Sequence, residues 1–256
     1  MSDLGLNLRG RVAVVTGGSR GIGRAVVERL AEAGVNVSIN YVRGEAAAAE
    51  AKRTAEGFGV RAEIIRGDVS SVAEALAVAR ATFEKFGRLD VLVCNAGLWE
   101  GAPVEEMNED LWGRVLDTNL KGTWAACRAA VPYMKRQAFG RIVIVSSTAG
   151  QRGEAYYSNY AASKGGQISF AKSLAVELAP NGINVNAVAP GWVSTEMTAD
   201  ALSEEGERRA VEDSIPLRRI ASPDEIARPV VFLCSDWARH ITGEVLNVNG
   251  GSVLCG

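Results

Sequence analysis

The stretch Val12-Ala-Val-Val-Thr-Gly-Gly-Ser-Arg-Gly-Ile-Gly23 joins a short apolar segment to a glycine-rich turn near the start of the chain. The segment Val12–Thr16 is typical of a buried parallel strand, and the residues after the turn have a helical pattern. Glycines at such a turn let the backbone approach a pyrophosphate, and the amide groups of the helix N-terminus bind it. The stretch therefore predicts a dinucleotide site at Gly17, Gly21 and Gly23.

The same turn contains the pattern G-x-S-x-G, in which Ser19 would be the nucleophile of an α/β-hydrolase and His240 its base. Two observations weigh against this alternative. The turn follows the first strand only, and His240, the only histidine, lies in the polar stretch 236–240 without an evident partner. Gly23 also has no function in such an elbow. We expect His240 to be a structural residue at the surface or an interface.

Working outward from the turn, short apolar segments alternate with longer amphipathic ones along most of the chain. The amphipathic stretches 24–33 and 72–86 are each followed by a glycine, which commonly ends a helix. Repeated strand–helix–strand units predict an α/β fold, a Rossmann-type doubly wound parallel sheet of about seven strands with helices on both faces. The expected strands are 12–16, 35–39, 61–65, 89–93, 141–145, 184–188 and 244–248, and a helix at 223–235 precedes the last strand.

Length and composition indicate a single domain over residues 1–256. A chain of 256 residues with 47% hydrophobic and 23% charged residues can bury one large core. The polar, acidic segment 194–215 lies between two prolines after the sixth expected strand. We predict that it is a lid insertion on the substrate side, and a solvated helical insertion is the alternative.

Charge and cysteine usage exclude several classes of function. The 28 basic and 30 acidic residues provide no positive field for a nucleic acid. The four cysteines are widely spaced and form no C-x-x-C pair, so we predict neither a metal site nor a disulfide framework. Residues 1–5 lack the features of a secretory signal, and no apolar run approaches membrane-spanning length. We therefore expect a cytoplasmic protein without a membrane segment.

The end of the second expected strand bears on the choice of dinucleotide. Enzymes that use NAD commonly have an acidic residue there for the ribose hydroxyls, but this strand ends in Asn40-Tyr41-Val42-Arg43. Arg43, together with Arg20 of the glycine turn, has the charge and geometry to bind a 2′-phosphate. The sequence thus favours NADP(H) over NAD(H), unless both arginines are merely exposed.

The segment Tyr160-Ala-Ala-Ser-Lys164 opens a helix in which the tyrosine and lysine lie one turn apart on the same face. An ammonium beside a phenol favours the phenolate, which lowers the pKa of the phenol. Such a pair can perform acid–base chemistry in a protein without a useful histidine. Taken alone, the pair has a structural interpretation as well.

Polar or glycine-containing residues follow one expected strand after another. They include Asp68-Val69, Asn95–Gly97, Ser146-Ser147 and Pro190-Gly191. The carboxyl ends of parallel strands meet at one edge of the sheet, which is also where the glycine turn would hold a dinucleotide. We therefore expect these residues to line one site with Tyr160 and Lys164.

Together these motifs resemble those of the short-chain dehydrogenase/reductase family over essentially the whole chain. They are T-G-x-x-x-G-x-G at 16–23, N-A-G at 95–97, Ser147 thirteen residues before the Y-x-x-x-K pair, and P-G followed by Thr195. Asn119 matches the fourth catalytic position of that family.

The resemblance implies a role for each of these residues. Tyr160 would protonate the oxygen of a reduced carbonyl, and Ser147 would hydrogen-bond that oxygen. Lys164 would lower the pKa of Tyr160 and hold the nicotinamide ribose, and Asn119 would position a water that links Lys164 to solvent. The residues expected to bind the dinucleotide are Gly17, Ser19, Arg20, Gly21, Ile22, Gly23, Tyr41, Arg43, Asp68, Val69, Asn95, Ala96, Gly97, Tyr160, Lys164, Pro190, Gly191, Val193 and Thr195.

Within the family, the segments 140–144, 159–165 and 241–251 resemble the 3-oxoacyl-[acyl-carrier-protein] reductases, which implies a 3-oxoacyl thioester as substrate and NADPH as reductant. The chain departs from that group where arginines often bind the carrier protein. It has Gln137-Ala138 and Asn181 there, with Arg136 as the only basic residue close by. A sugar or secondary-alcohol dehydrogenase with a small substrate is thus the alternative.

Two further expectations follow from the resemblance. A non-catalytic dinucleotide sensor would be expected to lack at least one of the four catalytic residues, and all four are present. The resemblance also implies a homotetramer, with which the small residues of 161–175 and the apolar tail 252–256 are compatible.

Overall fold

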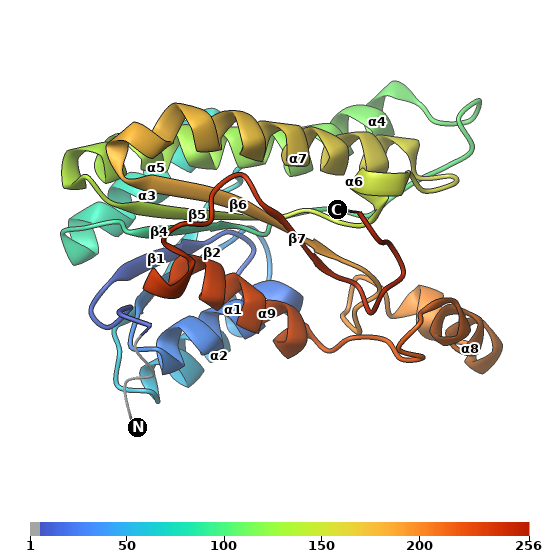
Figure 1. Ribbon diagram of the computed structural model, residues 1–256, viewed down its shortest axis with the longest axis horizontal. Helices are drawn as coiled ribbons and strands as arrows, with labels where there is room; N and C mark the ends of the chain where they lie inside the picture. The colour runs from blue at the N-terminus through green and yellow to red at the C-terminus, as the bar shows by residue number, and fades with distance from the viewer. Residues whose placement is uncertain (1–5, 256) are drawn as a thin grey trace.

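The computed structural model describes residues 6–255, and these residues form one seven-stranded sheet with helices on both faces (Figure 1). All strand pairings are parallel, in the order β3-β2-β1-β4-β5-β6-β7. This confirms the predicted doubly wound sheet. The prediction about residues 1–5 and the last residue of the apolar tail, Gly256, lie outside the described residues.

The strands and helices have the following bounds. The strands are β1 Val12–Val15, β2 Asn36–Tyr41, β3 Ala62–Arg66, β4 Val91–Cys94, β5 Gly140–Val145, β6 Ile183–Pro190 and β7 Val245–Val248. The α-helices are α1 Gly21–Glu32, α2 Glu45–Glu56, α3 Val72–Phe86, α4 Glu109–Leu116, α5 Gly122–Gln137, α6 Ala149–Arg152, α7 Ser158–Leu178, α8 Glu205–Ser214 and α9 Pro223–Cys234. Short helical turns are η1 Asp117–Lys121, η2 Ala179–Asn181, η3 Asp200–Leu202 and η4 Asp236–Ala238.

Each of the seven predicted strands is present, with ends that move by a few residues. One such difference is in β6, which continues to Pro190 instead of ending at Val188. The extension is possible because β7 pairs with residues 187–190 and supplies their backbone partners. As a result, the predicted Pro190-Gly191 motif begins on the strand itself.

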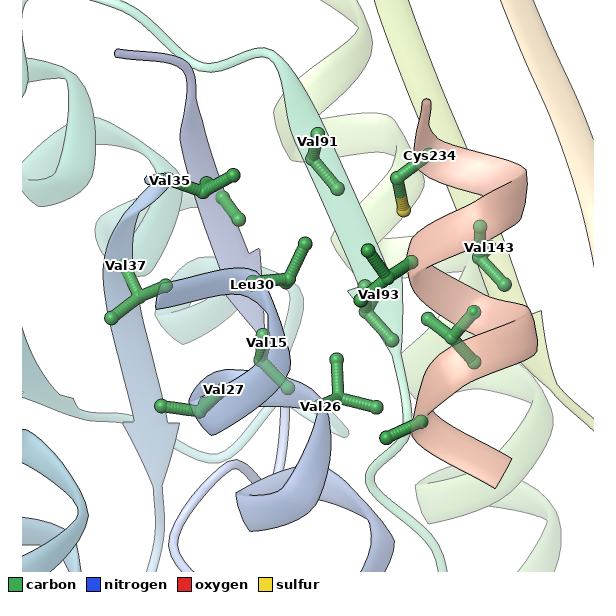
Figure 2. Close-up of a cluster of buried hydrophobic side chains, with 14 of the residues drawn as sticks. Val15, Val26, Val27, Leu30, Val35, Val37, Val91, Val93, Val143 and Cys234 are labelled. Atoms are coloured by element: carbon green, nitrogen blue, oxygen red, sulfur yellow. The ribbon is translucent and has the colours of Figure 1, made fainter. Parts of the chain in front are cut away.

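The two faces of the sheet are covered by different sets of helices (Figure 1). Alternate residues of β1 face opposite sides of the sheet. Ala13 and Val15 belong to the core under α1 and α9, and Val14 belongs to the core under α3, α5 and α7. Figure 2 shows α1 and α9 against the valines of the central strands, with Leu30 between strand and helix. Full burial of each such side chain contributes about 1.5–3 kcal/mol.

The topology leaves the carboxyl ends of the strands open for a ligand. Strand order reverses between β1 and β4, because β2 and β3 lie on one side of β1 and the later strands on the other. A crevice at such a switch point is the usual ligand site of an open parallel sheet. The site of this protein is therefore expected where the glycine turn after β1 meets the residues that follow β4.

The segment 194–215 contains η3 and α8, and none of the α8 residues is buried. Leu202 and Ile215 anchor it in a small core with Ile220, and Thr198 donates a hydrogen bond to the carbonyl oxygen of Val193. Within residues 6–255, the helices are too short or too polar to span a bilayer.

Candidate active site

The glycine turn after β1 is packed too closely for side chains. Gly17 has a φ of 63°, and a β-carbon there would lie 3.1 Å from Cα of Ala96. A β-carbon at Gly23 would overlap the carbonyl oxygen of Gly17 and lie 2.5 Å from Nδ2 of Asn95. Glycine is required at these two positions because the turn is pressed against the residues that follow β4.

The N-terminus of α1 meets the requirements of a pyrophosphate site. Arg20, the residue before the helix, makes no capping bond through its side chain, and the first turn contains no acidic residue. The backbone amides of that turn therefore retain their capacity to bind an anion, and the positive end of the helix dipole favours one. An open cavity lies directly beside this turn, lined by Gly21, Arg24 and Thr195 among others. The residues present thus fit the predicted dinucleotide.

Thr16, which the sequence analysis did not include among the site residues, joins the two halves of this crevice. Its hydroxyl accepts hydrogen bonds from the backbone N–H groups of Asn95 (2.9 Å) and Ala96 (3.1 Å). The side-chain amide of Asn95 in turn donates to the carbonyl oxygens of Thr16 and Gly17. Thr16 could have been predicted as a site residue, because it is the first residue of the glycine motif.

Three further residues that were predicted to bind the dinucleotide lie at or just after the carboxyl ends of β2 and β3. Tyr41 and Val69 are buried, and Asp68 is partly buried and accepts a hydrogen bond from the Ser70 backbone. Arg43 is exposed. Arg20 in the glycine turn is exposed as well, while Ser19 beside it is buried and Ile22 is partly buried.

Ser147, Tyr160 and Lys164 come together between β5 and α7. The hydroxyl of Ser147, which accepts a hydrogen bond from the Ala149 backbone at 3.1 Å, also acts on the pKa of the Tyr160 phenol. Lys164 is only 4% exposed, its Nζ donates to the carbonyl oxygen of Val145 at 2.9 Å, and the same atom lies 5.6 Å from the centre of the Tyr160 ring. A β-carbon at Gly97 would lie 3.6 Å from this Nζ, so the residues after β4 border the same group.

Burial dominates the titration of both catalytic candidates on α7. It raises the pKa of Tyr160 to about 12; the hydroxyl of Ser147 opposes this raising, and the charge of Glu154 adds to it. Burial lowers the pKa of Lys164 to about 8. The direction for Tyr160 is opposite to the one that the sequence analysis expected from the neighbouring lysine. The phenol is therefore protonated at neutral pH, the form that can donate a proton.

Asn119 lies in η1, a turn of π-helix between α4 and α5, and is fully buried. Its side-chain oxygen accepts from the Leu98 backbone at 2.7 Å, and its amide donates to Leu98 and to the hydroxyl of Ser163. Its backbone oxygen accepts from Gln167 and Thr123. Asn119 thus ties the loop after β4 to α7, next to Lys164. The water that the resemblance assigns to it stays a prediction.

Four residues that were predicted to bind the dinucleotide lie at the end of β6 or directly after it. The backbone N–H of Gly191 donates to Val248 in β7, and Val193 is buried and forms a bridge with Ala221. Thr195 faces the glycine turn: a β-carbon at Gly21 would lie 3.5 Å from its side chain. Pro190, Gly191, Val193 and Thr195 therefore stand on the same sheet edge as the catalytic candidates.

The hydrolase alternative is not supported. Ser19 follows β1 at the carboxyl edge of the sheet. His240 is exposed and follows η4, and its neighbours Arg239 and Ile241 accept hydrogen bonds from Asn184 at the start of β6. In a parallel sheet the starts and the ends of strands lie at opposite edges, so His240 is not placed to act as a base for Ser19.

Beside Tyr160 lies a group of aromatic side chains with one carboxyl group. Trp99 stacks on Tyr157 with ring centres 4.7 Å apart, and meets Trp192 edge to face at 5.7 Å. Its indole N–H donates to Glu154 at 3.2 Å. The sequence analysis did not identify Glu154.

Comparison with known proteins identifies the family. A family model described as enoyl-(acyl carrier protein) reductase matches residues 17–252. Among curated relatives, the 3-oxoacyl-[acyl-carrier-protein] reductase FabG of Aquifex aeolicus (strain VF5) is 43% identical over 246 residues, which cover 96% of this chain and 98% of the relative. The FabG proteins of Staphylococcus aureus (strain Mu50) and Vibrio harveyi are 43% and 40% identical, over 94% and 97% of this chain and 98% and 100% of their own lengths.

Solved structures agree with this assignment. A protein of Sinorhizobium meliloti 1021, provisionally assigned as a short-chain alcohol dehydrogenase, superposes with a TM-score of 0.93 at 38% identity and covers 97% of this chain and 98% of its own. The crystal structure of gox2181 superposes with a TM-score of 0.91 at 36% identity, covering 96% and 97% of the two chains. The chain therefore belongs to the short-chain dehydrogenase/reductase family, and it is an oxidoreductase that uses a nicotinamide dinucleotide.

Proposed function

We propose that the protein reduces a ketone to a secondary alcohol with NADPH. The observation that carries this proposal is the group of Ser147, Tyr160 and Lys164 at the carboxyl edge of the sheet, next to a glycine turn that fits a pyrophosphate. When bound, the nicotinamide would supply a hydride to the carbonyl carbon, and the protein contributes orientation and proton transfer.

In this proposal Ser147 and Tyr160 act together on the substrate oxygen. Ser147 follows the end of β5 and Tyr160 lies at the start of α7, and the Ser147 hydroxyl acts on the pKa of the phenol. A carbonyl oxygen there would accept hydrogen bonds from both, and the negative charge that develops on it would be stabilised. Tyr160 then donates its proton to that oxygen, which the raised pKa of the phenol permits at neutral pH.

Lys164 and Asn119 would support this proton transfer. Lys164, held by Val145, would hydrogen-bond the nicotinamide ribose and return a proton to Tyr160 after each turnover. Its lowered pKa of about 8 makes proton exchange near neutral pH easy. Asn119 would complete the path to solvent through a water, as in the family that the chain resembles.

For NADPH over NADH, the support is the charge at the adenosine end. Arg20 and Arg43 are both exposed near the carboxyl ends of β1 and β2, so their guanidinium groups are available to a 2′-phosphate. β2 ends in Tyr41, without an acidic residue to bind the 2′-hydroxyl.

Two substrate classes compete. The FabG relatives are 3-oxoacyl-[acyl-carrier-protein] reductases, which supports a 3-oxoacyl thioester. A small diffusible ketone is supported by the surface where the acyl carrier protein would bind, because the side chains there are engaged in other contacts. Gln137 is engaged with both backbone groups of Leu89, and Arg136 packs over the rings of Phe83 and Tyr133. The acyl carrier protein is therefore the less supported partner.

A panel assay tests the proposal. Purified protein is mixed with NADPH or NADH and with acetoacetyl thioesters, keto sugars or simple ketones, and the loss of absorbance at 340 nm is followed. We expect carbonyl-dependent oxidation of NADPH in at least one class. Failure of every class with both dinucleotides would refute the proposed function.

We propose further that the segment 194–215 is a lid over the substrate. Support comes from its anchor at the site: Thr198 donates to the carbonyl oxygen of Val193, and Trp192 packs against the core of Leu202 and Ile215. α8 contains no buried residue, which is typical of a segment that can move. The single domain 1–256 would then include this lid.

We also propose a homotetramer formed through α5, α7 and the C-terminal strand. Exposed apolar side chains on α5 and α7 support this, since Trp124 is 40% and Val176 is 80% exposed. Static light scattering at micromolar concentration tests it: a mass near 27.1 kDa would refute the proposal, and four times that mass would support it.

A further inference from the structure

Glu154 is a carboxyl group in the substrate region to which the mechanism above assigns no task. It lies between α6 and α7, is partly buried, and accepts one hydrogen bond, from the indole N–H of Trp99 to Oε1 at 3.2 Å. Among residues 6–255, Trp99 is the only side chain that donates to it. An ionised carboxylate can accept about four hydrogen bonds, so the second oxygen retains its capacity.

The two loops that carry this pair are pressed together. Tyr156 has a φ of 67°, which is strained for an aromatic residue and is maintained only where the surroundings determine it. A β-carbon at Gly101 would overlap the carbonyl oxygen of Tyr156 and lie 2.6 Å from the ring of Tyr157. The stacking of Trp99 on Tyr157 joins the same loops. Glu154 is therefore held in place by its surroundings.

The carboxyl group lies among the loops that border the catalytic phenol. Its partner Trp99 comes from the loop after β4, stacks on Tyr157, three residues before Tyr160, and meets Trp192 from the loop after β6. Burial raises the pKa of Glu154, and its charge contributes to raising the pKa of both Tyr157 and Tyr160. These loops stand at the same edge of the sheet as the keto group that the phenol of Tyr160 would protonate. The positive charge of Arg152 opposes the raising of the Glu154 pKa, and within residues 6–255 the two side chains form no ion pair.

We propose that Glu154 is a specificity-determining residue, which accepts a hydrogen bond from a hydroxyl group next to the keto group of the substrate. The inference rests on the proposed reduction of a ketone. A carboxylate in this position can only accept, so it favours a substrate with a donor and disfavours one with an alkyl group in the same place. Hydroxyketones are then preferred over the alkyl-substituted 3-oxoacyl group.

The test compares two substrates that differ only at that place, 1-hydroxybutan-2-one and pentan-3-one, in which a methyl group replaces the hydroxyl. The quantity measured is the ratio of their kcat/KM values with NADPH. We expect this ratio to fall about fivefold in Glu154→Gln, because a hydrogen bond to a charged group is roughly twice as strong as a neutral one. In Glu154→Met, where no acceptor remains, it should fall tenfold or more.

Glu100 provides the matched control. It is the neighbour of Trp99, but its carboxylate is bound by Arg114 at 2.6 Å and is 42% exposed. Glu100→Gln removes the same charge from the same loop, and we expect it to leave the ratio unchanged. Trp99→Phe keeps an aromatic ring but removes the donor that holds Glu154, and should lower the ratio without a change in the fold measured by circular dichroism.

The outcomes separate this inference from the proposed function. A ratio that is the same in wild type, Glu154→Gln and Glu154→Met, with pentan-3-one still reduced, would overturn the role of Glu154 alone. An equal loss for both substrates would also overturn it, because that is the signature of a structural role. If wild-type protein reduces no ketone and no thioester, the proposed function fails, and the inference fails with it.

Discussion

Burial of the Lys164 ammonium lowers the free energy of unfolding by an amount that depends on pH and can be measured without substrate. The pKa of Lys164 is lowered from 10.5 to about 8 because the ammonium loses its hydration. The unfolded chain therefore binds more protons than the folded one between pH 8 and pH 10.5, and stability rises with pH in that window. Below pH 8 the cost is fully present, and it disappears as the unfolded lysine loses its proton.

The variant Lys164→Met removes this cost at every pH. Relative to wild type, its unfolding free energy should be higher at pH 7 than at pH 10 by roughly 2–3 kcal/mol, at about 1.36 kcal/mol per unit of pKa difference. The hydrogen bond to Val145 is lost at both pH values, so it largely cancels in the comparison.

The assay is urea unfolding followed by tryptophan fluorescence, at fixed protein concentration and at several pH values. Lys172→Met, which replaces an exposed lysine on the same helix, is the control and should show no such trend. A stability difference between Lys164→Met and wild type that stays constant from pH 7 to pH 10 would refute the reasoning. The variant should also be inactive, whatever its stability.

Two further predictions concern the dinucleotide site. Gly23→Ala should abolish NADPH binding in isothermal titration and destabilise the fold by about 1–3 kcal/mol, because the new β-carbon meets backbone atoms that have no room to move. Gly113→Ala, in a helix with open space, is the control and should instead stabilise the fold by about 0.5–1 kcal/mol. Equal effects of the two substitutions on stability would contradict the prediction. Arg43→Ala and Arg20→Ala should each raise the KM for NADPH about tenfold or more and leave that for NADH nearly unchanged, since a charge-assisted bond to a phosphate contributes about 1.5–3 kcal/mol; unchanged NADPH kinetics would remove the basis for the preference.

The sheet was predictable from sequence because buried parallel strands carry a local signal. Val91–Cys94 and Ile142–Val145 are buried throughout, so their sequences are continuous apolar runs without alternation. The glycine turn was predictable for a similar reason, since Gly17 and Gly23 are required by a close backbone approach. In both cases the residue types in the sequence follow directly from burial or from close backbone packing.

Other features depend on contacts between distant segments. Glu154 receives its hydrogen bond from Trp99, 55 residues earlier, and nothing near it in sequence indicates a buried carboxyl group. The same holds for the pKa of Tyr160: the i, i+4 spacing pointed to a lowering by Lys164, but burial by the surrounding elements reverses the direction. The π-helical turn around Asn119 also has no local pattern, and is coupled to contacts with Gln167 on α7.

The central claim is that the phenol of Tyr160 donates the proton to the reduced carbonyl. The most direct measurement is the single-turnover rate of NADPH oxidation by Tyr160→Phe, with a ketone that the wild type reduces and with NADPH binding measured in parallel. Since a positioned general acid contributes about 10²–10⁴-fold, we expect the rate to fall by at least about 10²-fold while NADPH still binds. A variant that binds NADPH and reduces the ketone at the wild-type rate would contradict the account.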